Sequence, residues 1–509
     1  MRHKEIIMKQ TALTSIDSYK LAHAEMYPAG TTKVYSNFTP RSMTHFGVSE
    51  HHFRNGNAEK KIVWFGLQGF MYELRSIWKE TFFDRDIEEV VTEFSEFVAP
   101  FCGPNGFNVE RLRQLHALGY LPLEIKALPE GSSVPIGVPV LTITNTVDHA
   151  FWLPNFLETW MSSELWKSST SATTAKVYRK LIDSWADTTG GSKEFVPLQG
   201  HDFSVRGMSG IADAAKSGAG HLLSFIGTDN LPAVKYINDY YDGKKTFVGC
   251  SVPASEHSVM SSASKDAELD TYRYILSKYP SGVVSLVSDT YDFFQVITTY
   301  ATILKDDILN RTPDSLGLAK VVFRPDSGDP VKIIAGDPDA PEGSPEHKGA
   351  VECLWEIFGG TVNDKGFRTL NQRVGLIYGD SITIERCEEI LHQLAGQGFA
   401  SDNIVFGIGS YTYQHVTRDT LGFAMKATHR VTNGEGVAIF KDPKTDGGTK
   451  RSARGLLSVD RGSVSGDYVL RADVSPEVEK GGELRTVFLD GMLVNPVTIE
   501  DVRLKLAMG

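Results

Sequence analysis

The sequence predicts an α/β protein whose central part is an irregular (β/α) barrel, flanked by a mixed sheet-and-helix domain built from the N- and C-terminal parts. Two observations point to this class. Short, continuously apolar runs rich in Val and Ile recur through the second half of the chain, and most precede a helical pattern. Each run also ends in small polar residues, and the chemistry of barrels gathers at the carboxyl ends of their strands.

Length and charge limit the possible classes. A chain of 509 residues is long for one core, and we expect an N-terminal α+β domain over 1–150, the barrel over 151–430 and a C-terminal segment over 431–509 that packs with the N-terminal domain. A net charge of −11 argues against a general nucleic-acid or membrane binder, which needs a basic surface. Anionic small substrates stay possible, because a few local cations can build a phosphate site.

The cysteines and the apolar runs predict a cytoplasmic protein. The four cysteines are far apart in sequence and form no CxxC pair, so we expect reduced thiols rather than disulfides or a metal site. The N-terminus has no apolar core of signal-peptide length, and no apolar run approaches the length of a membrane helix.

The elements before the barrel follow from hydrophobic periodicity. Lys33 to Phe38 read as a strand that Pro40 ends, and a polar loop over 42–58 follows, whose histidines are more simply solvated than metal-bound. Helical spacing predicts helices within 84–101, 108–120 and 149–186, the last broken near Ser168 to Ser171; alternation and turns predict antiparallel strands within 123–145.

The barrel strands are predicted from six runs that end in polar residues. They are "HDFSV", "KTFVG", "VVSLV", "KVVFR", "VGLIY" and "NIVFGI", and helices are expected over 256–278, 291–309 and 382–395. Six strand ends within about 200 residues fit a barrel better than a small open sheet.

The strand ends carry acids, one histidine, glycines and cations. Glycines let backbone N–H groups approach phosphate oxygens, cations neutralise them, and carboxylates hold ribose hydroxyls or Mg²⁺. Taken singly, an Asp after a strand is as easily a helix cap, and a lone His is usually structural. Their coincidence at one end of one sheet favours a site for a phosphorylated sugar and a metal. The residues are Arg206, Asp229, Glu256, His257, Ser285, Ser288, Asp289, Arg324, Asp326, Asp329, Gly379, Asp380, Gly407 and Gly409.

Several of these motifs occur together in one known family. In their order and spacing, "HDFSVRG", "SVPASEHS", "VSLVSDTYD", "FRPDSGDP", "YGDSI" and "TRDTLGFAMK" resemble the type II phosphoribosyltransferases, and within them the nicotinamide phosphoribosyltransferases. The similarity extends to "DSYKLAH" and "KVYSNFTPR" near the start and "VTNGEGVAIFKDP" near the end, so it covers nearly the whole chain. The sequence departs from the family pattern at Val205, Ile408, Tyr411 and Ala424.

The resemblance implies a reaction and its requirements. Phosphoribosyl would pass from phosphoribosyl pyrophosphate to nicotinamide, giving nicotinamide mononucleotide and pyrophosphate in NAD salvage. Mg²⁺ would be required, and ATP would phosphorylate His257. The enzyme would be a homodimer with shared active sites, in which Tyr19 and Arg418 reach the partner's barrel. No nucleic-acid or membrane partner is implied.

The resemblance also assigns roles to residues. Catalysis would involve His257, Glu256, Asp289 and Asp326, and the last two would hold the metal. The nicotinamide ring would lie between Phe203 and Tyr19, with Asp229 accepting from the carboxamide and Arg324 beside it. Phosphoribosyl and phosphate groups would bind at Asp17, Arg206, Ser251, Ser285, Gly379, Asp380, Gly409, Ser410, Arg418 and Lys426. ATP or pyrophosphate would bind at Arg41, Lys441 and Lys450.

Three alternatives stay open. A nicotinate phosphoribosyltransferase would share the fold and the histidine, although Asp229 would repel the carboxylate of nicotinate. A barrel aldolase that forms a Schiff base needs a lysine at a strand end, and none of the six clusters has one; a glycosidase is a further barrel possibility. A non-catalytic binding or signalling protein could keep the fold. Product formation from nicotinamide, phosphoribosyl pyrophosphate and Mg²⁺ separates these alternatives.

Overall fold

The computed structural model describes residues 10–47, 60–103, 107–379, 381–441 and 453–509. The chain forms two compact units. Unit 1 comprises residues 1–173, 236–246 and 416–509, and unit 2 comprises residues 174–235 and 247–415. The domain boundaries expected from the sequence stay predictions. No helix in the described ranges is long and apolar enough to cross a membrane.

Unit 1 is built on an antiparallel sheet of seven strands that combines N- and C-terminal segments. The strand order is β15 (Glu435–Ala438), β14 (Ala424–Thr432), β1 (Thr31–Thr39), β5 (Leu141–Asn145), β3 (Leu123–Ala127), β18 (Arg485–Leu489) and β19 (Met492–Leu493). The predicted strand at 33–38 is therefore central, and the predicted antiparallel pairing within 123–145 is the β3–β5 pair. Two small sheets accompany it: β2 (Lys61–Val63) with β4 (Ser133–Pro135), and β16 (Leu456–Arg461) with β17 (Tyr468–Val474).

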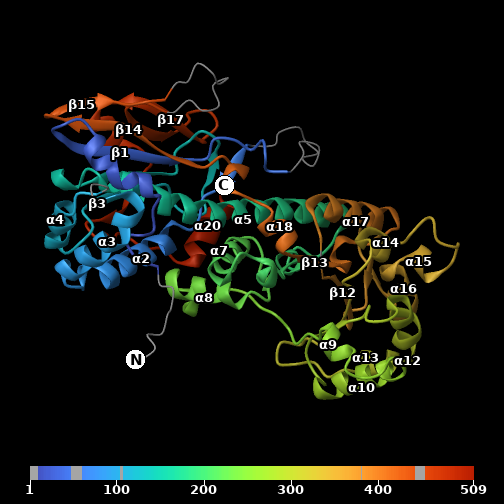
Figure 1. Cartoon of the computed structure of the whole chain (residues 1–509). Helices are drawn as coiled ribbons and strands as arrows, with labels where there is room; N and C mark the ends of the chain where they lie inside the picture. The colour runs from blue at the N-terminus through green and yellow to red at the C-terminus, as the bar shows by residue number, and fades with distance from the viewer. Residues whose placement is uncertain (1–9, 48–59, 104–106, 380, 442–452) are drawn as a thin grey trace, which may run out of the picture. The chain divides into compact units, whose positions relative to one another are not determined.

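Several helices belong to unit 1, and the first four of them share one apolar core with the sheet. They are α1 (His23–Met26), α2 (Leu67–Trp78), α3 (Ile87–Cys102), α4 (Glu110–Leu118), α19 (Pro476–Gly481) and α20 (Ile499–Ala507). Figure 1 shows α2, α3 and α4 together on one side of β1, β14 and β15. Phe38 of β1 stacks on Phe423 with ring centroids 5.0 Å apart, and both are buried in the core with Trp64 and Trp78. Aromatic burial of this kind dominates core energetics.

The long helix α5 (Leu153–Thr189) is continuous, so the break expected near Ser168 to Ser171 is wrong. Hydroxyl groups in this segment form hydrogen bonds that are compatible with the helix, so they do not end it. Thr173 Oγ1 donates to the Ser169 carbonyl at 2.6 Å and accepts from the buried Val63 N–H at 2.9 Å. Ser169 Oγ accepts from the Phe65 N–H at 3.0 Å. Tertiary contacts to the β2 region therefore outweigh the low helix propensity of Ser and Thr.

Unit 2 contains the predicted parallel sheet. Its order is β7 (Gly227–Thr228), β6 (Gly200–Asp202), β13 (Val405–Ile408), β12 (Val374–Tyr378), β9 (Val321–Arg324) and β8 (Val284–Val287). All neighbouring strands are parallel. The two edge strands, β7 and β8, are consecutive strands along the chain. This is typical of a sheet that curls until its two edges approach each other.

The expected strand "KTFVG" is not formed. The segment after it makes only two isolated parallel bridges, Gly227 with Cys250 and Ala254 with Ser285. These bridges place residues 250–254 between the two edge strands, so the sheet curls into an irregular barrel. The α/β fold class predicted from the sequence is confirmed. Gly249 and Pro253, on either side of residue 250, explain why this segment of the barrel stays irregular.

Helices follow most strands of unit 2. They are α6 (Val196–Gln199), α7 (Ile211–His221), α9 (His257–Met260), α10 (Glu268–Lys278), α11 (Phe293–Gln295), α12 (Ala301–Ile303), α13 (Lys305–Leu309), α14 (Pro330–Ala335), α15 (Pro345–Lys348), α16 (Ala350–Phe358), α17 (Ile384–Gly396) and α18 (Ser410–Gln414). Figure 1 shows α14, α16 and α17 together beside β12. A two-stranded ribbon, β10 (Gly360–Val362) with β11 (Arg368–Leu370), and the helix α8 (Leu231–Tyr240), shared by both units, complete the elements.

The helix predicted over 256–278 is two helices, α9 and α10, which is a correction. Residues 261–267 form turns and one 3-10 turn between them. The serines here bond back to the backbone: Ser261 Oγ donates to the His257 carbonyl at 2.6 Å, and Ser262 Oγ to the Val259 carbonyl at 2.7 Å. Such local bonds compete with helix continuation. The short α9 therefore carries His257 at its first residue, beside the sheet.

Candidate functional site

The carboxyl ends of the parallel strands carry most of the predicted site residues. Because these ends meet at one edge of the barrel, the side chains are brought together although they are far apart in sequence. The residues that lie one or two positions after the strands are Phe203 after β6, Asp229 after β7, Asp289 after β8, Asp326 after β9, Gly379 after β12 and Gly409 after β13.

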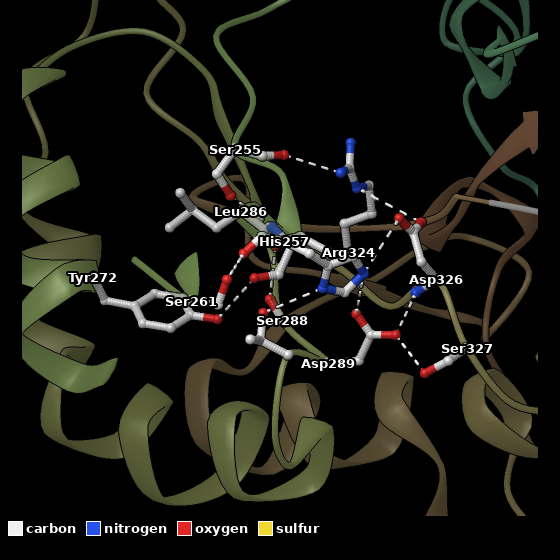
Figure 2. Close-up of polar contacts among 12 residues, drawn as sticks. Ser255, His257, Ser261, Tyr272, Leu286, Ser288, Asp289, Arg324, Asp326 and Ser327 are labelled. Carbon is white, nitrogen blue, oxygen red and sulfur yellow. Dashed lines mark hydrogen bonds and ion pairs between the residues drawn. The ribbon is translucent and has the colours of Figure 1, made fainter. Parts of the chain in front are cut away.

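His257 lies between two of these carboxylates (Figure 2). Its Nε2 atom is 3.6 Å from Asp289 Oδ1 and 3.9 Å from Asp326 Oδ2, and its Nδ1 atom is 3.3 Å from Thr290 Oγ1. The imidazole side chain is 50% exposed, whereas that of Asp289 is 5% exposed. A half-exposed imidazole held against one buried and one partly exposed acid can react with a ligand from its open side.

The two oxygens of Asp289 have different surroundings. Oδ2 accepts from the Asp326 N–H at 2.9 Å and from Ser327 Oγ at 2.5 Å. Oδ1 is buried and accepts a hydrogen bond from none of the described residues. Figure 2 shows this carboxylate directed toward His257 and Asp326. A buried carboxylate oxygen of this kind needs a partner, and a cation or a protonated imidazole would supply one.

Asp289 and Asp326 fit the Mg²⁺ that the resemblance implies. Mg²⁺ in enzymes of phosphorylated substrates is commonly held by one or two carboxylates, while waters and substrate phosphates fill its other positions. In the described ranges no group of three or more His, Cys, Asp or Glu side chains forms a ready-made metal site. The two carboxylates thus suit a metal that arrives with a diphosphate.

Arg324 lies near both the acid Asp326 and the aromatic ring of Phe203. Its Nη2 donates to the Ser255 carbonyl at 2.9 Å, and its Nε is 3.7 Å from Asp326 Oδ1. Its guanidinium carbon is 5.8 Å from the centre of the Phe203 ring. Gly379 leaves room for Asp326, because a Cβ at this position would overlap Asp326 Oδ1. A larger residue here would displace the Asp326 carboxylate from its present position.

Asp229 is held by two donors that reach the same oxygen. His201 Nε2 lies 3.0 Å from Asp229 Oδ1, and Ser251 Oγ also donates to Oδ1. Burial alone would raise the pKa of Asp229, but the hydrogen bonds from His201 and Ser251, with the Arg324 charge, outweigh it and hold the pKa below its usual range. The His201 ring also lies 4.5 Å from the Phe203 ring, centroid to centroid. An ionised acceptor therefore lies beside an aromatic face.

Several of the residues predicted for phosphate lie in unit 2, whereas Asp17, Arg418 and Lys426 lie in unit 1. Gly409 caps the short helix α18, which begins at Ser410, and Gly207 allows the Ser410 side chain to approach because a Cβ there would overlap its hydroxyl. Arg206 is exposed in a 3-10 turn after β6. Ser285 is buried in β8, where its backbone bonds to Pro253 and Ser255. Asp380 lies outside the described residues.

A second group of predicted residues gathers in unit 1. Burial lowers the pKa of Lys426, and the neighbouring cations Arg41, Lys20 and Arg418 lower it further, against the charge of Glu158. Lys20 pairs with Glu158 at 3.0 Å. Asp419 also pairs with Arg418 at 3.2 Å, so four cations share two carboxylates, and the remaining excess of positive charge suits a polyphosphate.

The remaining predicted residues of unit 1 have simpler surroundings. Tyr19 is 62% exposed, and its ring lies 5.3 Å from that of His23. Asp17 Oδ2 accepts from Thr159 Oγ1 at 2.6 Å. Lys441 is exposed at the end of a described range, and Lys450 lies outside the described residues. The exposed ring of Tyr19 is the feature that a stacking role requires.

Sequence reasoning missed several residues that contact the predicted ones: His201, Thr290 and Ser327 in unit 2, and Lys20 and Glu158 in unit 1. For His201 a signal was present, because residues two apart in a strand share a face and His201 precedes Phe203 by two. For Glu158 there was none, since its position near Lys426 depends on a contact across 268 positions of chain.

Comparison with known proteins agrees with this geometry. Residues 198–490 match the model of the nicotinate phosphoribosyltransferase (NAPRTase) family. The chain is 55% identical to the nicotinamide phosphoribosyltransferase of Acinetobacter baylyi, over 97% of each chain. It is 33% identical to that of Xanthomonas campestris pv. campestris, over 96% of this chain and 97% of the relative.

Solved structures share the fold at low sequence identity. Human nicotinic acid phosphoribosyltransferase superposes with a TM-score of 0.57 at 16% identity, over 97% of this chain and 93% of that chain. The nicotinate-nucleotide pyrophosphorylase of Pyrococcus furiosus superposes with a TM-score of 0.54 at 14% identity, over 100% of this chain and 98% of that chain. These similarities concern the fold alone.

Proposed function

The chain belongs to the nicotinate phosphoribosyltransferase family, and from this premise we propose that it transfers the phosphoribosyl group of phosphoribosyl pyrophosphate to nicotinamide. The products are nicotinamide mononucleotide and pyrophosphate. Curated relatives that are 55% and 33% identical over nearly the full length carry the name nicotinamide phosphoribosyltransferase. The reaction would serve the salvage of nicotinamide into NAD.

The observation that carries the choice of base is the state of Asp229. Its depressed pKa keeps the carboxylate ionised beside the Phe203 ring. A carboxylate only accepts hydrogen bonds, and the carboxamide of nicotinamide has an NH₂ group to donate. Nicotinate has no such donor and would bring a second negative charge. An ionised Asp229 therefore favours the amide over the acid.

The transfer needs positioning more than acid–base chemistry. The ring nitrogen of nicotinamide attacks C1′ of the ribose while the bond to pyrophosphate breaks, and the pyrophosphate leaves with the electron pair. The nucleophile has no proton to lose, so no base is required. Positive charge develops on the sugar, as in glycoside hydrolysis, and the Asp326 carboxylate near the ribose stabilises it.

Asp289 and Asp326 would hold Mg²⁺, which when bound neutralises charge on the departing diphosphate. Arg324, beside Asp326 and above the Phe203 ring, would line the junction between base and sugar. Gly409 and Ser410 would offer backbone N–H groups to the 5′-phosphate, with Arg206 and Gly379 nearby in the barrel.

We propose that His257 accepts a phosphoryl group from ATP. A ring nitrogen would attack the γ-phosphorus, the bond to ADP would break, and water would later remove the phosphoryl group from the imidazole. Three features support this role: the half-exposed ring, its place between Asp289 and Asp326, and the buried Asp289 Oδ1 that accepts from none of the described residues. Glu256, which precedes His257, would help to orient the phosphate or its metal.

We further propose a homodimer in which each barrel is completed by its partner. Tyr19 would stack on the far face of the nicotinamide ring, and Arg418 and Lys426 would contact phosphate groups, with Asp17, Arg41, Lys441 and Lys450 in the same role. The exposed Tyr19 ring and the excess of cations around Glu158 support this. All four cysteines are free thiols, which suits the cytoplasm.

The test is product formation with two bases. The purified protein is incubated with phosphoribosyl pyrophosphate and Mg²⁺, with nicotinamide or with nicotinate, and the mononucleotides are separated by chromatography. We expect nicotinamide mononucleotide, and a kcat/KM for nicotinamide well above that for nicotinate. A preference for nicotinate would contradict the proposed base. If neither mononucleotide is formed, the transfer itself is contradicted.

A further inference from the structure

We propose that His201 is a positioning residue that sets the choice of base through Asp229. This inference rests on the proposed function, because it concerns how nicotinamide is recognised. The imidazole of His201 contacts both residues that would hold the base: its Nε2 lies 3.0 Å from Asp229 Oδ1, and its ring centre lies 4.5 Å from that of Phe203. The side chain is 13% exposed, whereas that of Asp229 is 39% exposed.

The chemistry of this contact determines the protonation of the ring. A carboxylate oxygen accepts hydrogen bonds and cannot donate, so His201 Nε2 must carry the proton. Ser251 Oγ donates to the same oxygen. With both donors on Oδ1, and no described residue donating to Oδ2, the second oxygen is left to accept from a carboxamide NH₂. His201 thus selects which oxygen of Asp229 is used.

The backbone makes room for this arrangement. His201 of β6 pairs with Gly227 of β7. A Cβ at Gly227 would lie 2.9 Å from His201 Nδ1 and 3.0 Å from the Gly200 carbonyl oxygen, closer than side chains tolerate. Glycine at 227 therefore leaves room for the imidazole beside the neighbouring strand. The ring is placed by the sheet itself, so it can restrain the more exposed Asp229 side chain.

Restraint of Asp229 predicts a specific kinetic effect. Nicotinamide uses the oriented oxygen, whereas nicotinate is repelled by it. Loss of the His201 donor would weaken nicotinamide binding and leave nicotinate unaffected or improved. Ground-state and transition-state binding would be weakened alike, because the carboxamide takes no part in bond breaking, and so KM changes rather than kcat.

The experiment compares two substitutions of His201. His201→Phe keeps a ring against Phe203 but removes the donor, and His201→Gln keeps an N–H donor near the position of Nε2. For His201→Phe we expect the KM for nicotinamide to rise about 10-fold, because the loss of one hydrogen bond to a charged group has an effect of this size. The kcat should change less than about 2-fold. The ratio of kcat/KM for nicotinamide to that for nicotinate should fall by the same factor. His201→Gln should restore most of the KM.

Controls separate positioning from a loss of structure. The KM for phosphoribosyl pyrophosphate and the melting temperature should match the wild type in both variants, and Ser251→Ala, which removes the second donor to Oδ1, should shift the base ratio in the same direction. The inference is overturned if His201→Phe leaves the nicotinamide KM unchanged. It is overturned equally if His201→Gln is as impaired as His201→Phe, since restoring an N–H donor would then not restore binding of nicotinamide. The proposed function is judged separately, by whether the wild-type enzyme turns over nicotinamide at all.

Discussion

At the scale of single residues, the site combines one reactive group with one recognition group. His257 is half exposed beside the buried Asp289, and Asp229 is kept ionised by neighbouring donors. Neither property can be read from residue type. Histidine and aspartate are both common as structural residues, and their surroundings alone indicate a chemical role.

For His257, we expect that His257→Ala abolishes transfer of acid-labile label from γ-labelled ATP and also substrate-stimulated ATP hydrolysis. Slow synthesis of the mononucleotide should persist, because the acids, Phe203 and Asp229 keep their positions. His392→Ala removes an exposed histidine on α17 and serves as the matched control. Label that survives in His257→Ala as acid-labile phosphate would exclude His257 as the acceptor.

For Asp229, we expect that Asp229→Asn lowers the preference for nicotinamide over nicotinate. The asparagine keeps the size of the side chain, removes the negative charge and can donate to a carboxylate. The ratio of the two kcat/KM values should fall about 5- to 150-fold, equivalent to about 1–3 kcal/mol, and toward the lower end because the side chain is partly exposed. Asp187→Asn on the exposed face of α5 is the control. A ratio that does not move would assign specificity to another group.

At the scale of elements, buried polar side chains accept hydrogen bonds from backbone N–H groups where helices meet neighbouring segments. The hydroxyls of α5 accept from the β2 region, and Glu130 accepts from the Gly66 and Gln68 N–H groups at the start of α2, at 3.0 and 2.6 Å, and from Tyr241 at 2.8 Å. In both cases buried backbone groups depend on a side chain from elsewhere in unit 1.

We expect that Thr173→Val in α5 lowers stability by about 1–2 kcal/mol, because the buried Val63 N–H loses its acceptor while side-chain volume is kept. The melting temperature should fall by a few degrees, as measured by calorimetry or circular dichroism. Thr188→Val on the exposed face of the same helix makes the same change in helix propensity and should have a much smaller effect. Equal effects of the two substitutions would mean that propensity and not the contact to Val63 is responsible.

Glu130 predicts a pH dependence. Burial raises the pKa of Glu130, and the hydrogen bonds from Gly66, Gln68 and Tyr241 only partly oppose this. A raised folded-state pKa means that the contribution of this group is fully present below the unfolded value of about 4.3 and is lost as the pH rises through the folded value. The melting temperature of the wild type minus that of Glu130→Gln should therefore be larger at pH 5 than at pH 8. Glu89→Gln, at an exposed position on α3, is the control, and its difference in melting temperature from the wild type should not be larger at pH 5 than at pH 8. If the difference between the wild type and Glu130→Gln is the same at both pH values, the prediction is contradicted.

At the scale of the whole molecule, the predicted site residues divide between the two units. Phe203, Asp229 and His257 lie in unit 2, and Tyr19, Arg41, Arg418 and Lys426 lie in unit 1. The proposed homodimer would bring one chain's unit 1 residues to the other chain's barrel. A two-fold axis would create two equivalent composite sites.

Complementation tests this arrangement. Homodimers of Phe203→Ala and of Arg418→Ala should each be nearly inactive, whereas a mixed dimer gathers both substitutions in one site and leaves the other intact. Random reassociation makes about half of the dimers mixed, so activity should recover toward about a quarter of the wild-type value. Two different affinity tags verify that mixed dimers form. Mixed dimers that stay as inactive as the parents would show that Arg418 serves its own barrel.

Much of the fold could be predicted because strong local patterns agree with the tertiary structure. Five of the six expected barrel runs are strands, and the polar residues after them lie at one edge of the sheet. The exceptions have physical causes. The barrel segment near Cys250 is irregular because Gly249 and Pro253 weaken its pairing, and α5 is unbroken because contacts to β2 satisfy its hydroxyls. Local propensity is a weak term that such contacts outweigh.

The sequence by itself determined the α/β class, the positions of most strand ends and the family, because periodicity and motifs are properties of neighbouring residues. Only the tertiary structure decided which side chains meet. The two donors on Asp229 Oδ1, the orphaned Asp289 oxygen near His257 and the cations around Glu158 each join residues that are many positions apart. Ionisation and orientation depend on burial and on partners at 3–4 Å, and those distances exist only once the chain has folded.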